Sequence, residues 1–252
     1  MKNITLFSLC FSLFIAGQGF AEEKKYTFAA DYWCPYNCHP TAPQPGYIVN
    51  ILESVFGKKK IEYSEINWAR AIFETKNGNY NGIIAAGPNE APGFIYTKHK
   101  VGMQTVCFFT RANSTLKINS VKDIEGYKLG VIKDYTYFHK LDAYIAEDSN
   151  KKFIVTHYGE KALSLMTKAL FENKIDLFVE TEDVLAYELK SNIASIKKHY
   201  CNPPGNLYIA FSPKLKNSQE LANQVDKGID ELIRTGKMDA ILKQYGVKPW
   251  YK

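Results

Sequence analysis

The C-terminal segment from Asn217 to Trp250 reads NSQELANQVDKGIDELIRTGKMDAILKQYGVKPW and has the clearest pattern in the chain. Apolar side chains recur at helical spacing in its first half, which predicts a long helix with one buried face: Leu221, Val225, Ile229, Leu232 and Ile233. Gly236 is expected to end this helix, and a shorter helix follows from Met238 to Tyr245. Because the preceding AFSPK (210–214) has the pattern of a strand end, the chain closes with a strand and two helices.

Strand and helix patterns alternate along the rest of the chain. Short apolar or alternating runs predict strands at 26–30, 61–66, 82–86, 105–111, 127–132, 153–157, 175–179, 195–200 and 207–211. Helical stripes and capping residues predict helices at 48–56, 67–77, 120–126, 137–147, 160–172 and 181–189. This alternation indicates the α/β class, with parallel-rich sheets flanked by helices.

The ordered set of elements resembles the small type of bacterial periplasmic solute-binding protein, the group known for amino-acid binding. The resemblance rests on the C-terminal order of strand, long helix, glycine, short helix and closing aromatic-Gly, and on Ser120 to Ile132, where a short helix leads into a strand. It implies a two-lobed clamp of the periplasmic-binding-protein type II class. The first lobe would comprise residues 22–110 and 205–252, the second 111–204, with two hinge crossings near Cys107 and Cys201.

The first 21 residues have the pattern of a secretory signal. Lys2 precedes an apolar run at 4–16, and the small residues Gly19 and Ala21 stand before the expected cleavage site. The run is too short to span a membrane. A buried N-terminal helix is the alternative, but it leaves the glycines of this segment unexplained. We therefore expect a periplasmic protein.

Four cysteines follow the predicted signal, and an even number in an oxidising compartment predicts disulfides. Of three possible pairings we expect Cys34 with Cys38, closing a tight loop, and Cys107 with Cys201, joining the two hinge segments. A metal or haem site at Cys34, Cys38 and His39 is the alternative. CPYNCH is one residue longer than the usual haem-attachment motif, however, and a fourth metal ligand is not evident, so we expect no metal and no cofactor.

Candidate ligand contacts on the first lobe follow predicted strands, because ligands of parallel sheets bind at the carboxyl ends of the strands. Trp33 and Tyr36 follow the first strand, and each has a flat apolar surface with a polar group. Trp68 and Arg70 begin the second helix, and the Arg70 guanidinium suits a carboxylate. The alternatives are lobe packing for the aromatic residues and an ion pair for Arg70, with Glu65 or Glu74.

The loop at 85–92 departs from the family pattern. Amino-acid binders of this family typically carry Thr-x-x-Arg there, and the Arg holds the α-carboxylate of the ligand. Pro88 and Ala91 stand at the matching positions, so this Arg is missing. The resemblance therefore leaves two options, either replacement by Arg70 or a different ligand. Backbone groups around Gly87 are expected to remain contacts.

Candidates on the second lobe are Tyr135, Thr136 and Glu180. The segment 133–137 follows a strand and opens a helix, where the family commonly places Gly-Thr or Gly-Ser to bind a carboxylate; here Thr136 is present but the Gly is not. Glu180 ends a predicted strand, where the family often has an acidic residue for the ligand's ammonium. Capping of the following helix is its alternative role.

Composition and motifs exclude several function classes. The formal net charge of +6 is mild, and no basic stretch is interleaved with aromatic residues as nucleic-acid binding requires. Gly-x-Ser-x-Gly, His-Glu-x-x-His and phosphate-loop motifs are absent from the sequence. The resemblance to periplasmic solute-binding proteins then implies a monomeric, non-enzymatic protein that binds a small polar solute for an ABC-type transporter permease. The alternatives are a sensor input for a membrane receptor and a cyclohexadienyl dehydratase-like enzyme with Glu180 as its acid.

Overall fold

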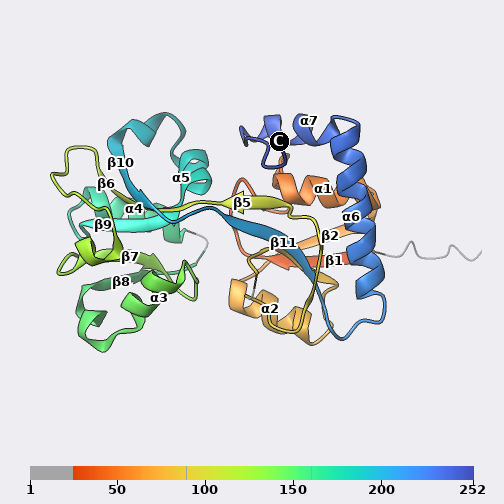
Figure 1. Cartoon of the computed structure of the whole chain (residues 1–252), viewed down its shortest axis with the longest axis horizontal. Helices are drawn as coiled ribbons and strands as arrows, with labels where there is room; N and C mark the ends of the chain where they lie inside the picture. The colour runs from red at the N-terminus through yellow and green to blue at the C-terminus, as the bar shows by residue number, and fades with distance from the viewer. Residues whose placement is uncertain (1–24, 89, 160) are drawn as a thin grey trace, which may run out of the picture.

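Two β-sheets with their helices make up the described part of this computed structural model, residues 25–88, 90–159 and 161–252 (Figure 1). The predicted signal sequence, residues 1–21, lies outside the described residues. The α/β class and the alternation of strands and helices expected from the sequence are confirmed.

The first sheet has the strand order β2–β1–β3–β11–β4, and β5 pairs with β11. β1 is parallel to β2 and β3, whereas β11 is antiparallel to β3, β4 and β5. The sheet is therefore mixed, with its parallel half on the N-terminal strands. Its strands are β1 (Tyr26–Ala30), β2 (Ile61–Glu65), β3 (Gly82–Ala86), β4 (Ile95–Tyr96), β5 (Gly102–Gln104) and β11 (Gly205–Phe211).

Helices cover both faces of the first sheet. Successive residues of a strand point to opposite faces, and in this sheet both sets of side chains are apolar and buried. Phe28 and Ile84 share a buried cluster with α1 (Tyr47–Phe56), α6 (Ser218–Arg234) and α7 (Lys237–Gln244). Ala29 and Ile83 lie in a second cluster with α2 (Trp68–Lys76). The predicted apolar stripe on α6 is buried, apart from Ile233, which is half-buried.

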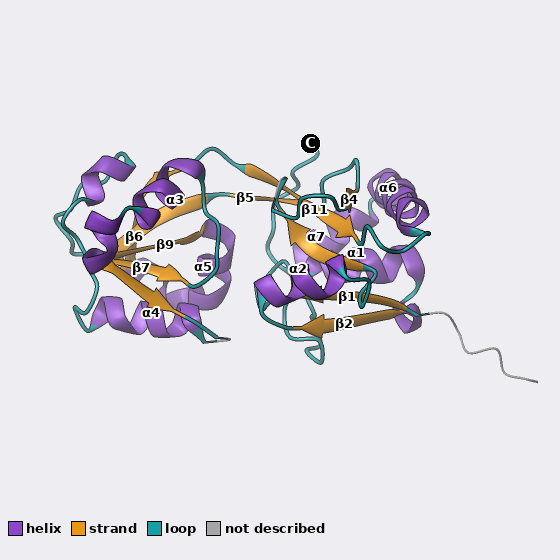
Figure 2. Cartoon of the chain, turned by 90° about the horizontal axis from the view of Figure 1, so that it is seen from below, coloured by secondary structure: helices purple, strands orange, loops and turns teal. Residues whose placement is uncertain are grey.

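The second sheet has the order β10–β6–β9–β7–β8, in which β7 is parallel to β8 and β9 while β6 is antiparallel to β9 and β10. Phe108 and Val179 face the cluster that includes α3, and their neighbours Phe109 and Phe178 face α4, so these helices cover opposite faces (Figure 2). The elements are β6 (Val106–Arg111), β7 (Leu129–Ile132), β8 (Ile154–His157), β9 (Leu177–Thr181), β10 (Ile196–Cys201), α3 (His139–Ala146), α4 (Ala162–Phe171) and α5 (Glu182–Leu189).

The helix predicted at 120–126 is a single 3₁₀ turn, Val121–Ile124. The Asp123 carboxylate accepts hydrogen bonds from the Asn119 backbone N–H and the Ser120 hydroxyl, which stabilises one tight turn before the chain enters β7. Other 3₁₀ turns are Lys58–Lys60, Asp148–Phe153 and Lys190–Ser195.

The chain passes between the sheets twice, from β5 into β6 and from β10 into β11 (Figure 1). The change of sheet lies between Gln104 and Val106, before the predicted limit at residue 110, because β6 pairs with β9 and β10. A Cys107–Cys201 disulfide joins the two passages, with the Cα atoms 4.0 Å apart. The second disulfide is Cys34–Cys38, so both predicted pairings are confirmed.

Candidate functional site

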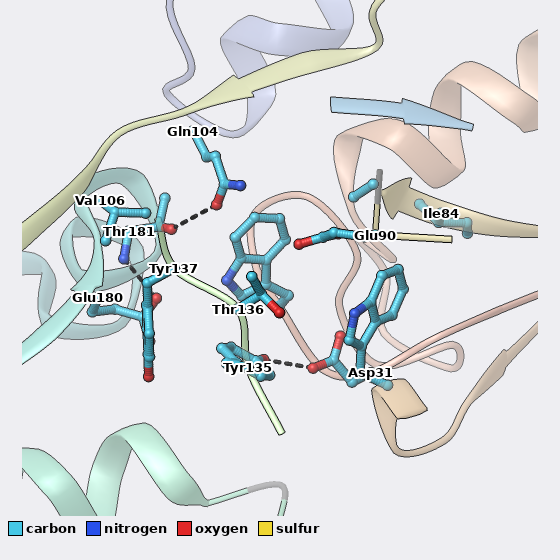
Figure 3. Close-up of a pocket in the computed structure, with 13 residues that line it drawn as sticks. Asp31, Ile84, Glu90, Gln104, Val106, Tyr135, Thr136, Tyr137, Glu180 and Thr181 are labelled. Carbon is cyan, nitrogen blue, oxygen red and sulfur yellow. Dashed lines mark hydrogen bonds between the residues drawn. The ribbon is translucent and has the colours of Figure 1, made fainter. Parts of the chain in front are cut away.

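A cavity lies between residues of the two lobes (Figure 3). The first lobe contributes residues after β1, in and after β3, at the start of α2 and at the end of β5. The second contributes residues at the start of β6, after β7 and at the end of β9. The lining residues are Asp31, Trp33, Trp68, Ile84, Ala85, Glu90, Gln104, Val106, Tyr135, Thr136, Tyr137, Glu180 and Thr181.

Glu180 is the most deeply buried carboxylate of the cavity, with 2% of its surface exposed. Its Oε1 accepts a hydrogen bond of 2.6 Å from the Thr181 backbone N–H. Burial raises the pKa of Glu180 from 4.5 to about 7, although the hydrogen bond from Thr181 and the nearby Trp33 indole both act in the opposite direction. The side chain is therefore costly to keep ionised without a cationic partner.

Two buried polar atoms of the cavity residues lack a hydrogen bond of normal geometry. They are Glu180 Oε2, an acceptor, and Trp33 Nε1, a donor. Such orphaned groups are rare in folded proteins, because each costs about 1–3 kcal/mol when it is left without a partner. Their presence in one cavity indicates a place where a bound molecule completes the hydrogen bonding.

Asp31 follows β1 directly and is half-buried at the opposite side of the cavity (Figure 3). Its Oδ2 accepts a 2.5 Å hydrogen bond from the Tyr135 hydroxyl. Desolvation raises the pKa of Asp31 from 3.8 to about 7 against the effect of this bond, and the negative charge of Glu90 adds to the rise. Burial also raises the pKa of Glu90, whose Oε2 accepts from the Gly87 backbone N–H at 2.8 Å.

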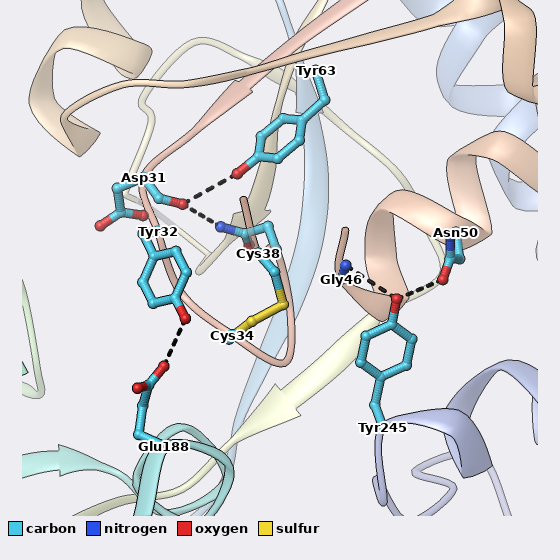
Figure 4. The surroundings of a disulfide bond; sticks show 10 residues. Asp31, Tyr32, Cys34, Cys38, Gly46, Asn50, Tyr63, Glu188 and Tyr245 are labelled. Carbon is cyan, nitrogen blue, oxygen red and sulfur yellow. Dashed lines mark hydrogen bonds between the residues drawn. A yellow bond between two sulfur atoms is a disulfide. The ribbon is translucent and has the colours of Figure 1, made fainter. Parts of the chain in front are cut away.

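Hydrogen bonds cross from one lobe to the other around the cavity. The bond from Tyr135 to Asp31 is one, and the Tyr32 hydroxyl donates to Glu188 Oε1 of α5 at 2.8 Å (Figure 4). The Tyr36 hydroxyl lies 3.4 Å from Asp183 Oδ2 at the start of the same helix. These contacts join the two lobes beside the cavity.

Disulfide Cys34–Cys38 closes the loop that directly follows Trp33 (Figure 4). The Trp33 backbone N–H donates to the Asn37 carbonyl at 2.8 Å, and the Asn37 side-chain amide donates to the Asp31 carbonyl at 2.6 Å. Because the loop is fixed at both ends, Trp33 and Asp31 have little freedom to leave the cavity wall.

Five of the eight residues predicted as ligand contacts line the cavity: Trp33, Trp68, Tyr135, Thr136 and Glu180. Glu180 lies within β9, which continues to Thr181, and not in the loop after a strand ending at Val179. Capping of α5 is not its role, because the helix begins at Glu182 without a side-chain cap.

The other three predicted residues lie outside the cavity lining. The Arg70 side chain is 70% exposed and pairs with Glu74 at 3.5 Å, which is the alternative that the sequence left open. Tyr36 is fully buried beneath Trp33, stacked on it with ring centroids 4.3 Å apart, and its hydroxyl donates to the Met103 carbonyl at 2.7 Å. The Gly87 backbone N–H donates to the Glu90 carboxylate within the same loop. This geometry does not support direct ligand contact for these residues.

Sequence reasoning missed Asp31 and Glu90. Asp31 is the first residue after β1, so the strand-end rule that selected Trp33 applies to it equally. Glu90 lies in the loop singled out for its missing Arg, where its carboxylate reaches back to Gly87.

No metal site is indicated in the described residues. The only cluster with metal-ligand spacing there combines Cys107, Cys201 and Glu182, and its two sulfur atoms form the hinge disulfide. Within residues 25–88, 90–159 and 161–252, no helix has the length and apolar character of a membrane span.

Comparisons with known proteins place the fold. No family model matches the chain, and no curated protein matches its sequence. A histidine kinase sensor domain with similarity to periplasmic binding proteins is 16% identical, with a TM-score of 0.71, covering 90% of this chain and 98% of its own. An ancestral arginine-binding protein bound to arginine is 16% identical, with a TM-score of 0.70 over 89% of this chain and 98% of its own. The arginine-, lysine-, histidine-binding protein ArtJ from Geobacillus stearothermophilus is 17% identical, with a TM-score of 0.69. The alignment covers 90% of this chain and 97% of ArtJ. The chain therefore has the two-lobed fold of periplasmic binding proteins, as the sequence predicted.

Proposed function

We propose that this protein binds a small polar solute, an amino acid or a related compound, in the cavity between its lobes and closes around it. The observation that carries the proposal is a pair of buried polar atoms in the cavity, Trp33 Nε1 and Glu180 Oε2, which both lack a hydrogen bond of normal geometry. Because Trp33 belongs to the first lobe and Glu180 to the second, a solute that contacts both side chains stabilises the closed clamp more than the open one.

The setting of this activity is the periplasm, and the receiver of the solute is an ABC-type transporter permease. The signal pattern at residues 1–21 and the two disulfides support export to an oxidising compartment. Two of the similar structures bear the names of amino-acid-binding proteins, which supports solute capture over catalysis.

A sensor input domain is the second candidate, and one specific observation favours it. One similar structure is a histidine kinase sensor domain, and its alignment spans 98% of that domain. Both roles use the same cavity, so the receiving membrane protein distinguishes them. Neighbouring genes for a permease and an ATPase would support import, whereas a neighbouring receptor kinase gene would support sensing.

A thermal-shift screen of the mature protein tests the binding function. Amino acids, short peptides, amines and organic acids form the panel, and a ligand at 100 times its Kd is expected to stabilise the protein by about 2.7 kcal/mol. Small-angle scattering with and without the best ligand then reports closure as a smaller radius of gyration. A failure of every compound class to raise the melting temperature would contradict solute binding, and an unchanged radius at saturation would contradict the clamp.

A further inference from the structure

Carboxylates dominate the charge of the cavity. Asp31 and Glu90 reach it from the first lobe and Glu180 from the second, on opposite sides of the space (Figure 3). Among the residues that the structure describes, the lining contains no Lys, Arg or His. A wider opening shares Asp31 and Glu180 with this cavity, and its wall adds Glu65 and Glu188. Basic residues of that opening, Lys133 and Lys161, do not belong to the lining of the inner cavity.

The Arg70 guanidinium lies outside the cavity lining, and two main-chain donors of the loop at 85–92 already have acceptors. Arg70 pairs with Glu74 on the exposed side of α2. In the loop at 85–92, the Gly87 N–H donates to Glu90 and the Ala91 N–H donates to the Tyr96 hydroxyl. A carboxylate placed in the cavity would therefore face several like charges, and the main-chain donors of this loop would not compensate for its desolvation.

Aromatic side chains supply the rest of the wall. Trp33, Trp68, Tyr135 and Tyr137 all line the cavity. The faces of aromatic rings attract organic cations, and the attraction strengthens when water is excluded. Tyr36, stacked on Trp33 and fixed by its bond to the Met103 carbonyl, holds that indole in place before a ligand arrives. Carboxylates combined with aromatic side chains make a site suited to ammonium groups.

We infer that the solute is a small organic cation that carries at least one ammonium group and no carboxylate. This inference rests on the proposed function and narrows it from polar solutes in general to amines. In the complex, an ammonium N–H donates to Glu180 Oε2, the acceptor that lacks a hydrogen bond of normal geometry, and the positive charge lies against the aromatic wall. Asp31 and Glu90 supply the countercharge from the first lobe.

Isothermal titration calorimetry with matched pairs tests the inference, because each pair differs only by the α-carboxylate: agmatine and arginine, putrescine and ornithine, cadaverine and lysine. We expect at least one amine to bind, and to bind about ten- to hundredfold more tightly than its amino acid, the range of one charged interaction. Equal or tighter binding of the amino acid in every pair that binds would overturn the inference while leaving solute binding intact. Binding of only neutral or anionic compounds from the wider panel would do the same. Binding of no compound at all would contradict the proposed function itself.

Two variants locate the interaction. Glu180→Gln keeps the shape of the side chain and removes its charge, and Asp31→Asn does the same on the other lobe. Each is expected to weaken binding of the selected amine about tenfold or more. Glu172→Gln is the matched control, because this carboxylate pairs with Lys168 and Lys174 on the surface of the second lobe. Glu180→Gln and Asp31→Asn proteins that melt cooperatively but bind the amine as tightly as the control would overturn the inference.

Discussion

Glu180→Gln is expected to stabilise the ligand-free protein above neutral pH. The carboxyl has 2% exposure and its pKa is raised from 4.5 to about 7, chiefly by burial. The folded state therefore holds this proton more tightly than the unfolded chain does. Its contribution to stability is complete below pH 4.5 and is lost as the pH rises through about 7. Because one pKa unit corresponds to about 1.4 kcal/mol, the full effect is about 3 kcal/mol, of which about 2.5 kcal/mol falls between pH 5 and pH 8.

Chemical denaturation at pH 5 and pH 8 measures this contribution. The free energy of unfolding of Glu180→Gln should fall about 2.5 kcal/mol less over that interval than that of the parent protein. A smaller decline should remain in the variant, since the pKa of Asp31 is also raised to about 7. Glu172→Gln is the control, because its surface lysines lower the pKa of Glu172. Equal declines in the parent and Glu180→Gln would refute the conclusion that Glu180 is desolvated in the unliganded cavity.

Further predictions concern the hinge, the packing, closure and Arg70. Replacing Cys107 and Cys201 together by Ala should lower the free energy of unfolding by about 2–5 kcal/mol, as measured by denaturation without reductant; unchanged stability would contradict a structural role for this disulfide. Gly228→Ala should lower the free energy of unfolding by about 1–3 kcal/mol in the same assay, because a Cβ there would lie 2.3 Å from Val55 Cγ2 where α6 packs on α1. A neutral effect would mean that these two helices separate easily. Tyr135→Phe removes the hydrogen bond to Asp31 and should increase the radius of gyration of the ligand-free protein in small-angle scattering. An unchanged radius would show that this bond does not hold the lobes together. Arg70→Ala should leave the solute affinity unchanged in calorimetry, because the side chain pairs with Glu74 outside the cavity. A tenfold loss of affinity would show that Arg70 contacts the ligand.

Regular periodicity made most of the fold predictable. The buried face of α6 is visible in the spacing from Leu221 to Leu232, because helix geometry repeats every 3.6 residues. The strands β4 and β5 were not predicted, since two and three residues are too few to show an alternation. The turn at Val121–Ile124 looked like a helix because its capping residues suit both structures.

The site was predictable where backbone geometry alone fixes direction. Trp33, Tyr135 and Thr136 follow strands of the two sheets, so their place at the cavity follows from strand direction. Tyr36 and Arg70 depend on features that spacing does not contain. The Cys34–Cys38 loop places Tyr36 beneath Trp33, and the turn of α2 directs Arg70 toward Glu74.

A crystal structure with the amine selected by calorimetry tests most directly the claim that an organic cation binds between the lobes. We predict an ammonium nitrogen within hydrogen-bond distance of Glu180 Oε2, enclosed by Trp33, Trp68 and Tyr135, with the lobes closed around it. A ligand bound elsewhere on the protein, or one whose carboxylate is held by Arg70 with Glu180 left unpaired, would contradict the account.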